Sequence, residues 1–314
     1  MLFGLPLPLL ALLMAAGLLL DCLFGEVRRW HPLVGFGILA STVERRLNVG
    51  LHRFGRGVAA WSIAVLPSVL LAALACAFTS PWIAAVWHAL LLYFCIGLRS
   101  LRDHMLPIAE ALLQGDLDGA RHLTSRIVSR DTAQASSSDL VKAAVESMLE
   151  NGNDAVFGTL FWFLVAGGPG ALLFRLANTL DAMWGYRTPR FASFGCAAAR
   201  IDDALNWIPA RLTALSYAAL GNARLAWFCW RTQAPHWSSP NAGPVMASGA
   251  GALCLALGGE ASYHGAIEYR PTLGHGRAAK AADIARAWRL VARTAMLWLA
   301  LATIAGAFAI LKGI

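Results

Sequence analysis

The stretch VAAWSIAVLPSVLLAALACAFTSPWIAAVWHALLLYFCIGL runs from Val58 to Leu98 and contains no Asp, Glu, Lys or Arg. A helix that crosses a membrane needs about 20 mostly apolar residues. Val58–Phe78 and Trp82–Leu98 both approach that length, and only Thr79-Ser80-Pro81 separates them. The sequence therefore predicts two membrane-spanning helices joined in a tight hairpin.

Further apolar stretches lie on both sides of this hairpin. They cover residues 1–20, where Pro6 and Pro8 interrupt the start, then 155–177, 212–230 and 290–311. Residues 243–259 are rich in small side chains and either span the membrane or pack as a soluble helix. The GGPG sequence at Gly167–Gly170 divides 155–177 into halves that are too short to span alone. This segment is predicted to be a broken helix or a re-entrant pair.

Composition supports a membrane protein, because 58% of the 314 residues are hydrophobic and only 14% are charged. Soluble domains carry about 25% charged residues. The net charge of +8 comes from basic residues in the loops 21–57, 99–154 and 260–289. The positive-inside rule places these loops in the cytoplasm and both chain ends outside, so no nucleic-acid partner is needed to explain the charge.

The fold class predicted from these features is all-α, a polytopic helical integral membrane protein with cytoplasmic helical inserts. A single membrane-embedded domain is expected over 1–314, with polar inserts at 99–154 and 178–206. No strands or internal repeats are predicted. Six cysteines lack any CxxC spacing, and the histidines lack metal-site spacing, so neither a disulfide framework nor a zinc site is expected.

The first polar constellation combines SRDT at Ser129–Thr132 with ESMLENGND at Glu146–Asp154. Glu146 and Glu150 lie four residues apart on one helix face, where like charges cost a few tenths of a kcal/mol. One interpretation is a solvated face that ends in an Asn/Gly stop signal. The other is a carboxylate–amide cluster for hydrated Mg²⁺, which prefers one or two carboxylates together with substrate phosphate.

Two further constellations follow the broken apolar segment. In the first, Asn178 and Asp181 share a helix face and precede two loop arginines. The second is RIDDALNWIPARL, from Arg200 to Leu212, which places acids and amides directly before an apolar stretch. Anchoring at the lipid headgroups explains either cluster alone. If 155–177 is re-entrant, however, all three constellations fall on the same cytoplasmic face and form one polar site.

The motifs of this chain resemble those of the CobD/CbiB family of cobalamin biosynthesis, the adenosylcobinamide-phosphate synthases. The resemblance runs in family order through LDCLFGEVRRWHPLVGFG (Leu20–Gly37), SRDT, AAVESMLENGNDAVFGTLFW (Ala143–Trp162), the segment Gly167–Leu215, SPNAG (Ser239–Gly243) and RPTLG (Arg270–Gly274). Gly25-Glu26-Val27 departs from the Gly-Asp-Pro typical of other members, but it keeps the acidic character.

The resemblance implies a ligase that forms an amide bond. The expected reaction joins adenosylcobyric acid to (R)-1-amino-2-propanol or its O-phosphate and gives adenosylcobinamide or its phosphate, with ATP and Mg²⁺. It further implies a multi-pass protein of the cell inner membrane, with its active site on the cytoplasmic face. Expected partners are the corrinoid, the amine, the lipid bilayer and other late cobalamin-assembly enzymes.

Carried onto this sequence, the chemistry assigns expected roles to three sets of residues. The catalytic candidates are Glu146, Asp181, Asp202 and Asp203. The candidates for metal or amine binding are Glu146, Asn153 and Asp154. The candidates for phosphate, corrinoid or ligand contacts are Arg130, Arg187, Arg190, Arg200, Asn178, Asn206, His31 and Asn241.

Two rival functions come from other classes. A non-enzymatic membrane sensor like AmpE is one, but a relic without catalysis is expected to lose the Asn/Asp/Arg set, which is whole here. A small-molecule transporter is the other, favoured by the broken helix and by polar residues within 212–230. Against a transporter, the chain has no repeated halves, and its polar clusters lie at the edges of the apolar stretches.

Overall fold

The computed structural model describes residues 5–27, 31–128, 130–263 and 266–313. Arg28 and Arg29 of the first basic loop, and Ser129 of the SRDT motif, lie outside the described residues. The chain divides into two compact units. Unit 1 comprises Met1–Gly97, Asp154–Asn206 and Leu299–Ile314, and unit 2 comprises Leu98–Asn153 and Trp207–Trp298. The single domain expected over 1–314 stays a prediction.

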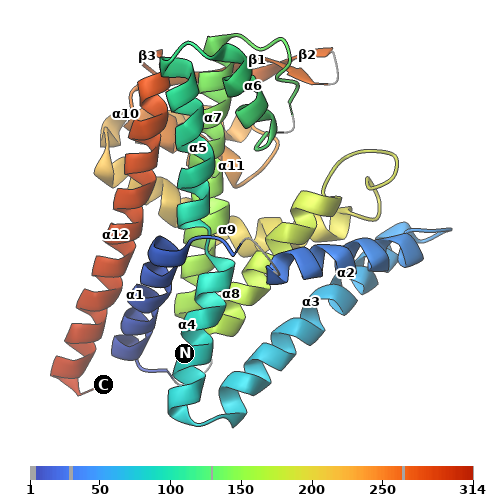
Figure 1. Cartoon of the computed structure of the whole chain (residues 1–314), viewed down its shortest axis with the longest axis vertical. Coiled ribbons are helices and arrows are strands. Elements are labelled where there is room, and N and C mark those ends of the chain that lie inside the picture. The colour runs from blue at the N-terminus through green and yellow to red at the C-terminus, as the bar shows by residue number, and fades with distance from the viewer. Residues whose placement is uncertain (1–4, 28–30, 129, 264–265, 314) are drawn as a thin grey trace. The chain divides into compact units, whose positions relative to one another are not determined.

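Unit 1 is helical. It contains α1 (Leu7–Phe24), α2 (Pro32–Leu47), α3 (Arg53–Phe78), α4 (Pro81–Cys95), α8 (Gly158–Trp184), the first part of α9 (Cys196–Leu220) and the end of α12 (Ala281–Lys312) (Figure 1). The predicted hairpin is confirmed, because α3 ends at Phe78 and Pro81 begins α4. Pro6 and Pro8 lie at the start of α1, where proline is tolerated, so they begin this helix rather than break it.

The core of unit 1 lies where α2, α3 and α8 meet. Phe36, Trp61 and Leu180 are buried there, and the ring of Trp184 packs edge-on against Phe194 at 5.2 Å between centroids. A side chain at Gly57 would place its Cβ 2.0 Å from the backbone oxygen of Phe194. Glycine is therefore required for this close approach between α3 and the segment before α9.

The helix break predicted within 155–177 is confirmed in α8. Ala166 and Gly167 leave the helical conformation, and Gly167 has a φ of 60°. The backbone N–H of Gly168 donates a hydrogen bond to Nδ1 of His88, from α4, at 2.8 Å. A break inside a membrane segment requires such a partner, because lipid cannot satisfy the freed backbone groups.

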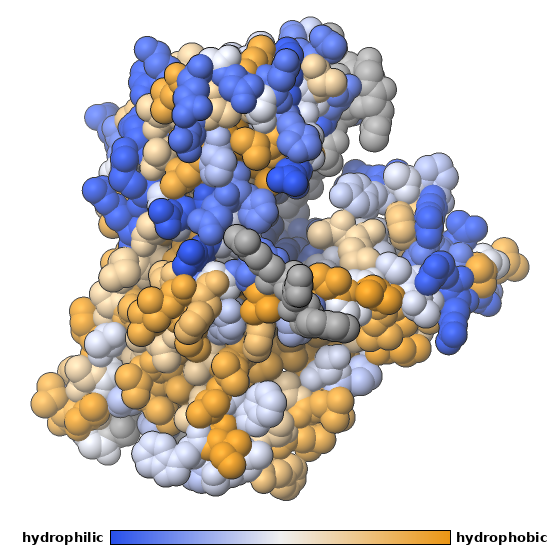
Figure 2. Space-filling view, viewed as in Figure 1, coloured by the Kyte–Doolittle hydropathy of each residue, from blue (hydrophilic) through white to orange (hydrophobic). Residues whose placement is uncertain are grey.

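Among the described residues, five helical stretches are long and apolar enough to cross a membrane: Leu7–Phe24, Arg53–Phe78, Pro81–Leu113, Ser137–Trp184 and Ala281–Lys312. In unit 1, hydrophobic residues cover the α3–α4 hairpin (Figure 2). The protein is a helical, polytopic membrane protein, as predicted. The span expected at 212–230 is wrong, because α9 ends at Leu220 and Asn222 caps a new helix by accepting the Leu225 N–H.

Unit 2 contains shorter, more polar helices. They are α5 (Leu98–Leu113), α6 (Leu117–Ser125), α7 (Ser137–Asn151), the rest of α9, α10 (Ala223–Gln233), the 3₁₀ turn η2 (Ala234–His236), α11 (Ala242–Ala252) and the first part of α12. Hydrophilic residues gather over α5 and α6 (Figure 2). The SSSD sequence at Ser136–Asp139 predicts a helix N-cap. This prediction is confirmed, since Ser136 and Asp139 form a capping box that starts α7.

The sequence analysis predicted no strands. This prediction is wrong for residues 255–278 of unit 2. Strands β1 (Leu255–Tyr263), β2 (Ala266–Leu273) and β3 (Arg277–Ala278) form a sheet in the order β2-β1-β3. β1 pairs antiparallel with β2 and parallel with β3. The register shifts between Leu257 and Gly259, where Gly258 and Gly259 take φ values of 75° and 81°. Glycines of low strand propensity and this bulge conceal the period-two pattern that identifies strands.

The strands also show whether residues 243–259 span the membrane or pack as a soluble helix. The helix α11 ends at Ala252, every residue from Gly243 to Ala252 is buried, and β1 begins three residues later. This segment is therefore a packed helix of unit 2 followed by a strand, and it does not span.

Candidate functional site

The first polar site lies in unit 1 and is called here the acidic cluster. Its members come from the π-helix η1 (Gly152–Phe157), α8 and α9, and they are Asp154, Asn178, Asp181, Asp202, Asp203 and Asn206. Asn206 Nδ2 donates to Asp154 Oδ1 at 2.9 Å, and Asn178 Nδ2 donates to Asp202 Oδ1 at 3.4 Å. The structure thus brings together six predicted site residues. Asp154 comes from the end of the first constellation, and the other five come from the second and third.

Electrostatics in the acidic cluster act most strongly on Asp202. Its side chain is buried, and burial, followed by the negative charges of Asp154 and Asp181, raises the pKa of Asp202 well above its ordinary value of 3.8. The hydrogen bond from Asn178 opposes this shift. A carboxylate whose pKa is raised above its ordinary value is a better proton acceptor than an ordinary aspartate.

Arg175 is a residue of this region that the sequence reasoning missed. It lies on α8, three residues before Asn178, so the two share one helix face. The charges of Glu26 and Asp154 act on its guanidinium, and its Nε atom is buried with no hydrogen-bond partner among the described residues. The sequence did contain a signal that could have identified Arg175. An arginine inside an apolar spanning segment marks a functional site by default.

The acidic cluster has the donor chemistry that Mg²⁺ uses, namely aspartate oxygens supplemented by amides. Among the described residues, no group of three or more His, Cys, Asp or Glu side chains is arranged to hold a metal ion by itself. Magnesium commonly takes one or two carboxylates and completes its shell with water and substrate phosphate. The cluster therefore fits a magnesium ion that arrives with a phosphate-bearing ligand.

The second polar site is a cavity of about 270 Å³ in unit 2, called here the α7 cavity. Glu146 lies in its wall, 3% exposed, and binds Arg130 Nη2 and Arg270 Nη1 at 2.7 Å each. The backbone N–H of Gly258 donates to the other oxygen of Glu146 at 2.9 Å. Residues from the SRDT, ENGND, SPNAG and RPTLG motifs all line this cavity.

These contacts change the interpretation of Glu146. Both of its oxygens already accept charge-assisted or backbone hydrogen bonds, so the carboxylate serves to hold Arg130 and Arg270 in place. The other two predicted metal ligands have hydrogen-bond partners of their own. Asn153 accepts a hydrogen bond from Thr213 within unit 2, and Asp154 belongs to the acidic cluster of unit 1. The metal role proposed for these three residues as a group stays a prediction.

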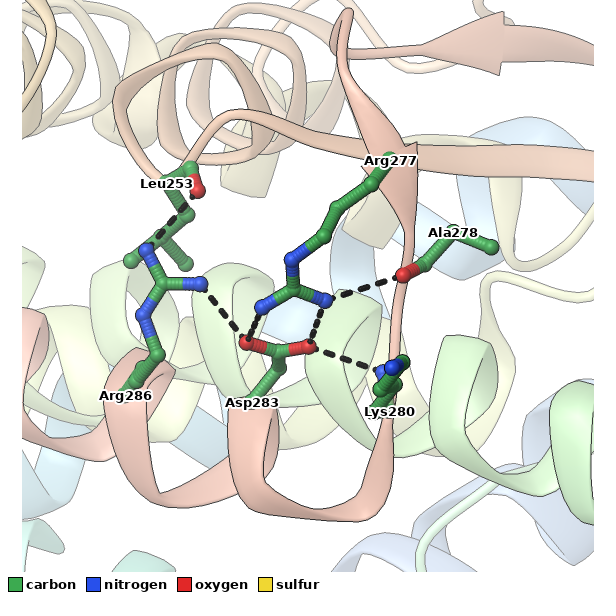
Figure 3. Close-up of polar contacts among 6 residues, drawn as sticks. All are labelled: Leu253, Arg277, Ala278, Lys280, Asp283 and Arg286. Atoms are coloured by element: carbon green, nitrogen blue, oxygen red, sulfur yellow. Dashed lines mark hydrogen bonds and ion pairs between the residues drawn. The ribbon is translucent and has the colours of Figure 1, made fainter.

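Asp283 fastens the sheet that carries Arg270 (Figure 3). Its buried carboxylate accepts two hydrogen bonds from Arg277 of β3, one from Arg286 and one from the Lys280 backbone N–H. Arg286 also donates to the Leu253 carbonyl at 3.0 Å. This cluster ties β3 to the start of α12, and it was not recognised in the sequence because its members are split between a strand and a helix.

The remaining predicted residues belong to neither the acidic cluster nor the lining of the α7 cavity. Arg190 binds Glu44 through Nε and Nη2 at 3.0 and 2.6 Å, beside a cavity of about 560 Å³ in unit 1. His31 caps α2 by accepting the Leu33 N–H at 3.1 Å. Asn241 accepts from Arg211 in unit 2 at 2.7 Å. Arg187 and Arg200 are exposed. The ligand contacts expected for these five residues stay predictions.

Comparison with known proteins identifies the family that this chain matches. The model of the family described as CobD/Cbib protein matches residues 14–291. The chain is 56% identical to the cobalamin biosynthesis protein CobD of Stutzerimonas stutzeri over 90% of this chain and 93% of that protein. It is 53% identical to the protein of the same name from Chromobacterium violaceum, over 93% of this chain and 95% of that one.

A more distant relative shares the same name. The cobalamin biosynthesis protein CobD of Mycobacterium tuberculosis is 39% identical over 86% of this chain and 88% of that protein. No solved structure matches the chain. The family model covers most of the sequence, and the relatives match nearly end to end. The motifs that line the α7 cavity and the acidic cluster are therefore those of a family member: the chain belongs to the CobD/CbiB family.

Proposed function

We propose that this protein acts in cobalamin biosynthesis as a ligase. In the proposed reaction, ATP drives amide formation between adenosylcobyric acid and (R)-1-amino-2-propanol or its O-phosphate. The observation that carries the proposal is the acidic cluster, in which the buried Asp202 has a raised pKa and receives a hydrogen bond from Asn178. Membership of the family and the names of its relatives support the pathway.

Amide formation poses two chemical problems, and unit 1 has groups suited to each. Magnesium-bound ATP would supply the phosphate that turns the substrate carboxylate into an acyl group with a good leaving group. The amine is protonated at neutral pH, so it must lose a proton before its nitrogen can attack. When the C–N bond forms, the C–O bond to phosphate breaks and the phosphate leaves with the electron pair.

Asp202 is the proposed acceptor of the amine proton. Its raised pKa suits this role, and Asn178 fixes one of its oxygens. Asp154, held by Asn206, is a proposed carboxylate for the metal, and Arg175 is a proposed cation for phosphate oxygens. Positioning by such fixed groups lowers the entropic cost of bringing the reactants together.

A turnover assay tests the proposal. Purified protein in detergent receives adenosylcobyric acid and Mg-ATP, with aminopropanol or its O-phosphate in parallel arms, and the product is detected by mass. Amide in either arm, lost when ATP is omitted and in Asp202→Asn but not in Asp103→Asn, supports the ligase. Asp103 is the matched control because it is an exposed aspartate of unit 2 paired with Arg99. Absence of amide from folded protein in both arms would favour the sensor instead.

The proposal also includes an inner-membrane location with the reacting groups on the cytoplasmic side. The five apolar stretches support a membrane protein, and the positive-inside rule supports the orientation. Labelling of single cysteines introduced into the basic loops, by a reagent that does not cross the membrane, checks the orientation in intact cells. Labelling from outside at 99–154 contradicts it.

A further inference from the structure

The cavity of about 560 Å³ in unit 1 is called here the α2 cavity, and the proposed reaction does not use it. It is lined by α2, by the end of α8 and by the segment that follows α8. We propose that the α2 cavity binds an anionic phospholipid, with the phosphate beside two arginines and the acyl chains beside apolar side chains. The inference rests on unit 1 alone and does not depend on the proposed ligase.

One face of α2 changes from apolar to basic along its length. Four residues of this helix with exposed or half-buried side chains line the cavity at spacings of four, three and four positions: Val34, Ile38, Ser41 and Arg45. Such spacing places them on one helix face. Over these eleven positions the helix rises roughly 16 Å. Two apolar side chains, a hydroxyl and a guanidinium follow the order of chain, glycerol ester and phosphate in a phospholipid.

The rest of the wall supplies the same two kinds of group. Met183, Trp184 and Phe191 are apolar, and Arg190 is basic. On the α2 side, Gly37 has no side chain, and the nearest atom that a Cβ there would meet is Met183 Sδ at 4.0 Å. The small residue therefore leaves room for an acyl chain between α2 and the end of α8.

A buried carboxylate holds one of the two arginines in position. The side chain of Glu44 is 5% exposed, and it accepts hydrogen bonds from Nε and Nη2 of Arg190 at 3.0 and 2.6 Å. These two bonds use one edge of the guanidinium group. Nη1 makes no hydrogen bond to the described residues, so it is available to donate to a phosphate oxygen.

Arg45 supplies the second positive charge. It is exposed, and its guanidinium donates to the hydroxyl of Thr42 at 3.4 Å. Its charge also acts on Glu44, so two arginines share one carboxylate at this end of the cavity. The excess of one positive charge complements a phosphodiester, which carries one negative charge. The ammonium group of a zwitterionic lipid would add a positive charge, so an anionic headgroup is favoured.

Exposed apolar side chains favour a lipid over a soluble anion. Val34 and Ile38 are 64% and 65% exposed, although they lie on the same helix face as Arg45. The helix α2 has 16 residues and is not one of the five stretches able to span. A helix with an exposed apolar face and arginines at its end suits the interface between acyl chains and headgroups. The positive-inside rule makes the cytoplasmic leaflet the expected source of the lipid.

Native mass spectrometry of the full chain, released from detergent micelles, tests the site. The protein is incubated with equal amounts of phosphatidylglycerol and phosphatidylcholine that have identical acyl chains. We expect phosphatidylglycerol to bind about tenfold more tightly, the effect of one charge-assisted contact. Equal retention of the two lipids would overturn the anionic headgroup.

Two adjacent arginines separate a specific site from general attraction to anionic lipid. Arg45→Gln removes a charge from the cavity wall and is expected to weaken phosphatidylglycerol about tenfold, with phosphatidylcholine unchanged. Arg46→Gln makes the same change at an exposed residue outside the lining, and it should bind both lipids like the unaltered protein. Equal losses in the two variants would overturn the site.

Two glycines of α2 test the apolar part of the cavity. Gly37→Leu fills the space beside Met183 and is expected to weaken phosphatidylglycerol about tenfold, by excluding one or two methylene groups from the wall. Gly35→Leu is the matched control, because Gly35 lies outside the lining and a Cβ there would meet nothing within 4 Å. Unchanged affinity in Gly37→Leu would show that the chains do not enter the α2 cavity and would overturn the proposal.

Inorganic phosphate distinguishes a lipid headgroup from a soluble anion. Added at the same concentration as phosphatidylglycerol, it is expected to leave the lipid bound. Displacement of the lipid would assign the arginines to a soluble anion and overturn the proposal. Thermal unfolding shows that every variant is folded and gives a second readout. Phosphatidylglycerol should raise the melting temperature of the unaltered protein and of Arg46→Gln more than that of Arg45→Gln. Equal increases in all three would contradict the site.

Discussion

His88 Nδ1 accepts the backbone N–H of Gly168 at 2.8 Å, which joins α4 to the break in α8. His88 is buried, and Gly167 beside the break has a φ of 60°. A Cβ at Gly167 would lie 2.6 Å from the imidazole ring. The break therefore depends on a specific acceptor from α4 and on the small size of the neighbouring glycine.

Replacing His88 by leucine is expected to destabilise unit 1. The Gly168 N–H would lose its acceptor in a region closed to water, at a cost of about 1–3 kcal/mol. Thermal unfolding in detergent measures the change. His88→Gln is the matched variant, because its amide oxygen can accept the same hydrogen bond, and it is expected to unfold closer to the unaltered protein. Equal melting temperatures for the leucine variant and the unaltered protein would refute this account.

The bulge in β1 offers a matched pair of glycines. Gly258 and Gly259 both have positive φ, but a Cβ at Gly258 would lie 2.3 Å from the Pro271 oxygen, whereas nothing lies within 4 Å of one at Gly259. Gly259→Ala is expected to cost about 1–2 kcal/mol from backbone strain alone. Gly258→Ala adds the close contact and disturbs the N–H that binds Glu146, so it should melt lower. A reversed order would contradict the role given to the bulge.

Glu146 is expected to be the most sensitive charged residue of unit 2. Glu146→Gln leaves Arg130 and Arg270 without their shared carboxylate, and breaking a buried ion pair in this way costs about 3–5 kcal/mol. Adding Arg130→Gln removes one of the two stranded charges, so the double variant should melt above Glu146→Gln alone. If Glu146→Gln and Arg130→Gln instead lower the melting temperature additively, the three residues do not act as a unit.

The features that could be predicted from the sequence are local ones. The hairpin at 79–81, the break at 167–170 and the cap at Ser136 each depend on a few adjacent residues whose conformational preferences are strong. The pairing of Glu146 with Arg270 spans 124 positions and a strand that has no clear alternation, so no pattern in the sequence indicates it.

At the π-helix, residues adjacent in the sequence have different hydrogen-bond partners in the structure. Asn153 and Asp154 were grouped with Glu146 as one metal site. In the structure, Asn153 pairs with Thr213, and Asp154 pairs with Asn206. The extra residue per turn of a π-helix changes the direction in which successive side chains point, and π-helical turns often occur at functional sites. Helical periodicity of 3.6 residues could not anticipate this change.

The pair formed by Glu44 and Arg190 predicts a dependence of stability on pH. The hydrogen bonds from Arg190 hold the pKa of the buried Glu44 below its ordinary value of 4.5. The pair therefore stabilises unit 1 above pH 4.5, and that contribution disappears as the pH falls through the lowered folded-state pKa. Arg190→Met should melt below the unaltered protein at pH 7, with the gap closing in acid. A gap that does not narrow as the pH falls below 4.5 would exclude the ion pair as its cause.

Asp202 predicts the opposite dependence. Its folded-state pKa is raised above 3.8, so the folded chain holds the proton more tightly than the unfolded chain. Stability from this group is therefore lost as the pH rises from 3.8 through the folded-state pKa. Asp202→Asn removes that penalty and should melt above the unaltered protein at pH 8, with little difference at pH 4.

The same substitution should damage catalysis while it improves stability. Loss of a general base lowers turnover by about 10²–10⁴-fold, and the rise of kcat/KM with pH that reports deprotonation of Asp202 should vanish with it. Asp103→Asn is the control for both measurements. Higher stability with lower turnover is the signature of a residue kept for chemistry at a cost to folding. Asp202→Asn that melts higher and turns over normally would leave the acidic cluster without its proposed base.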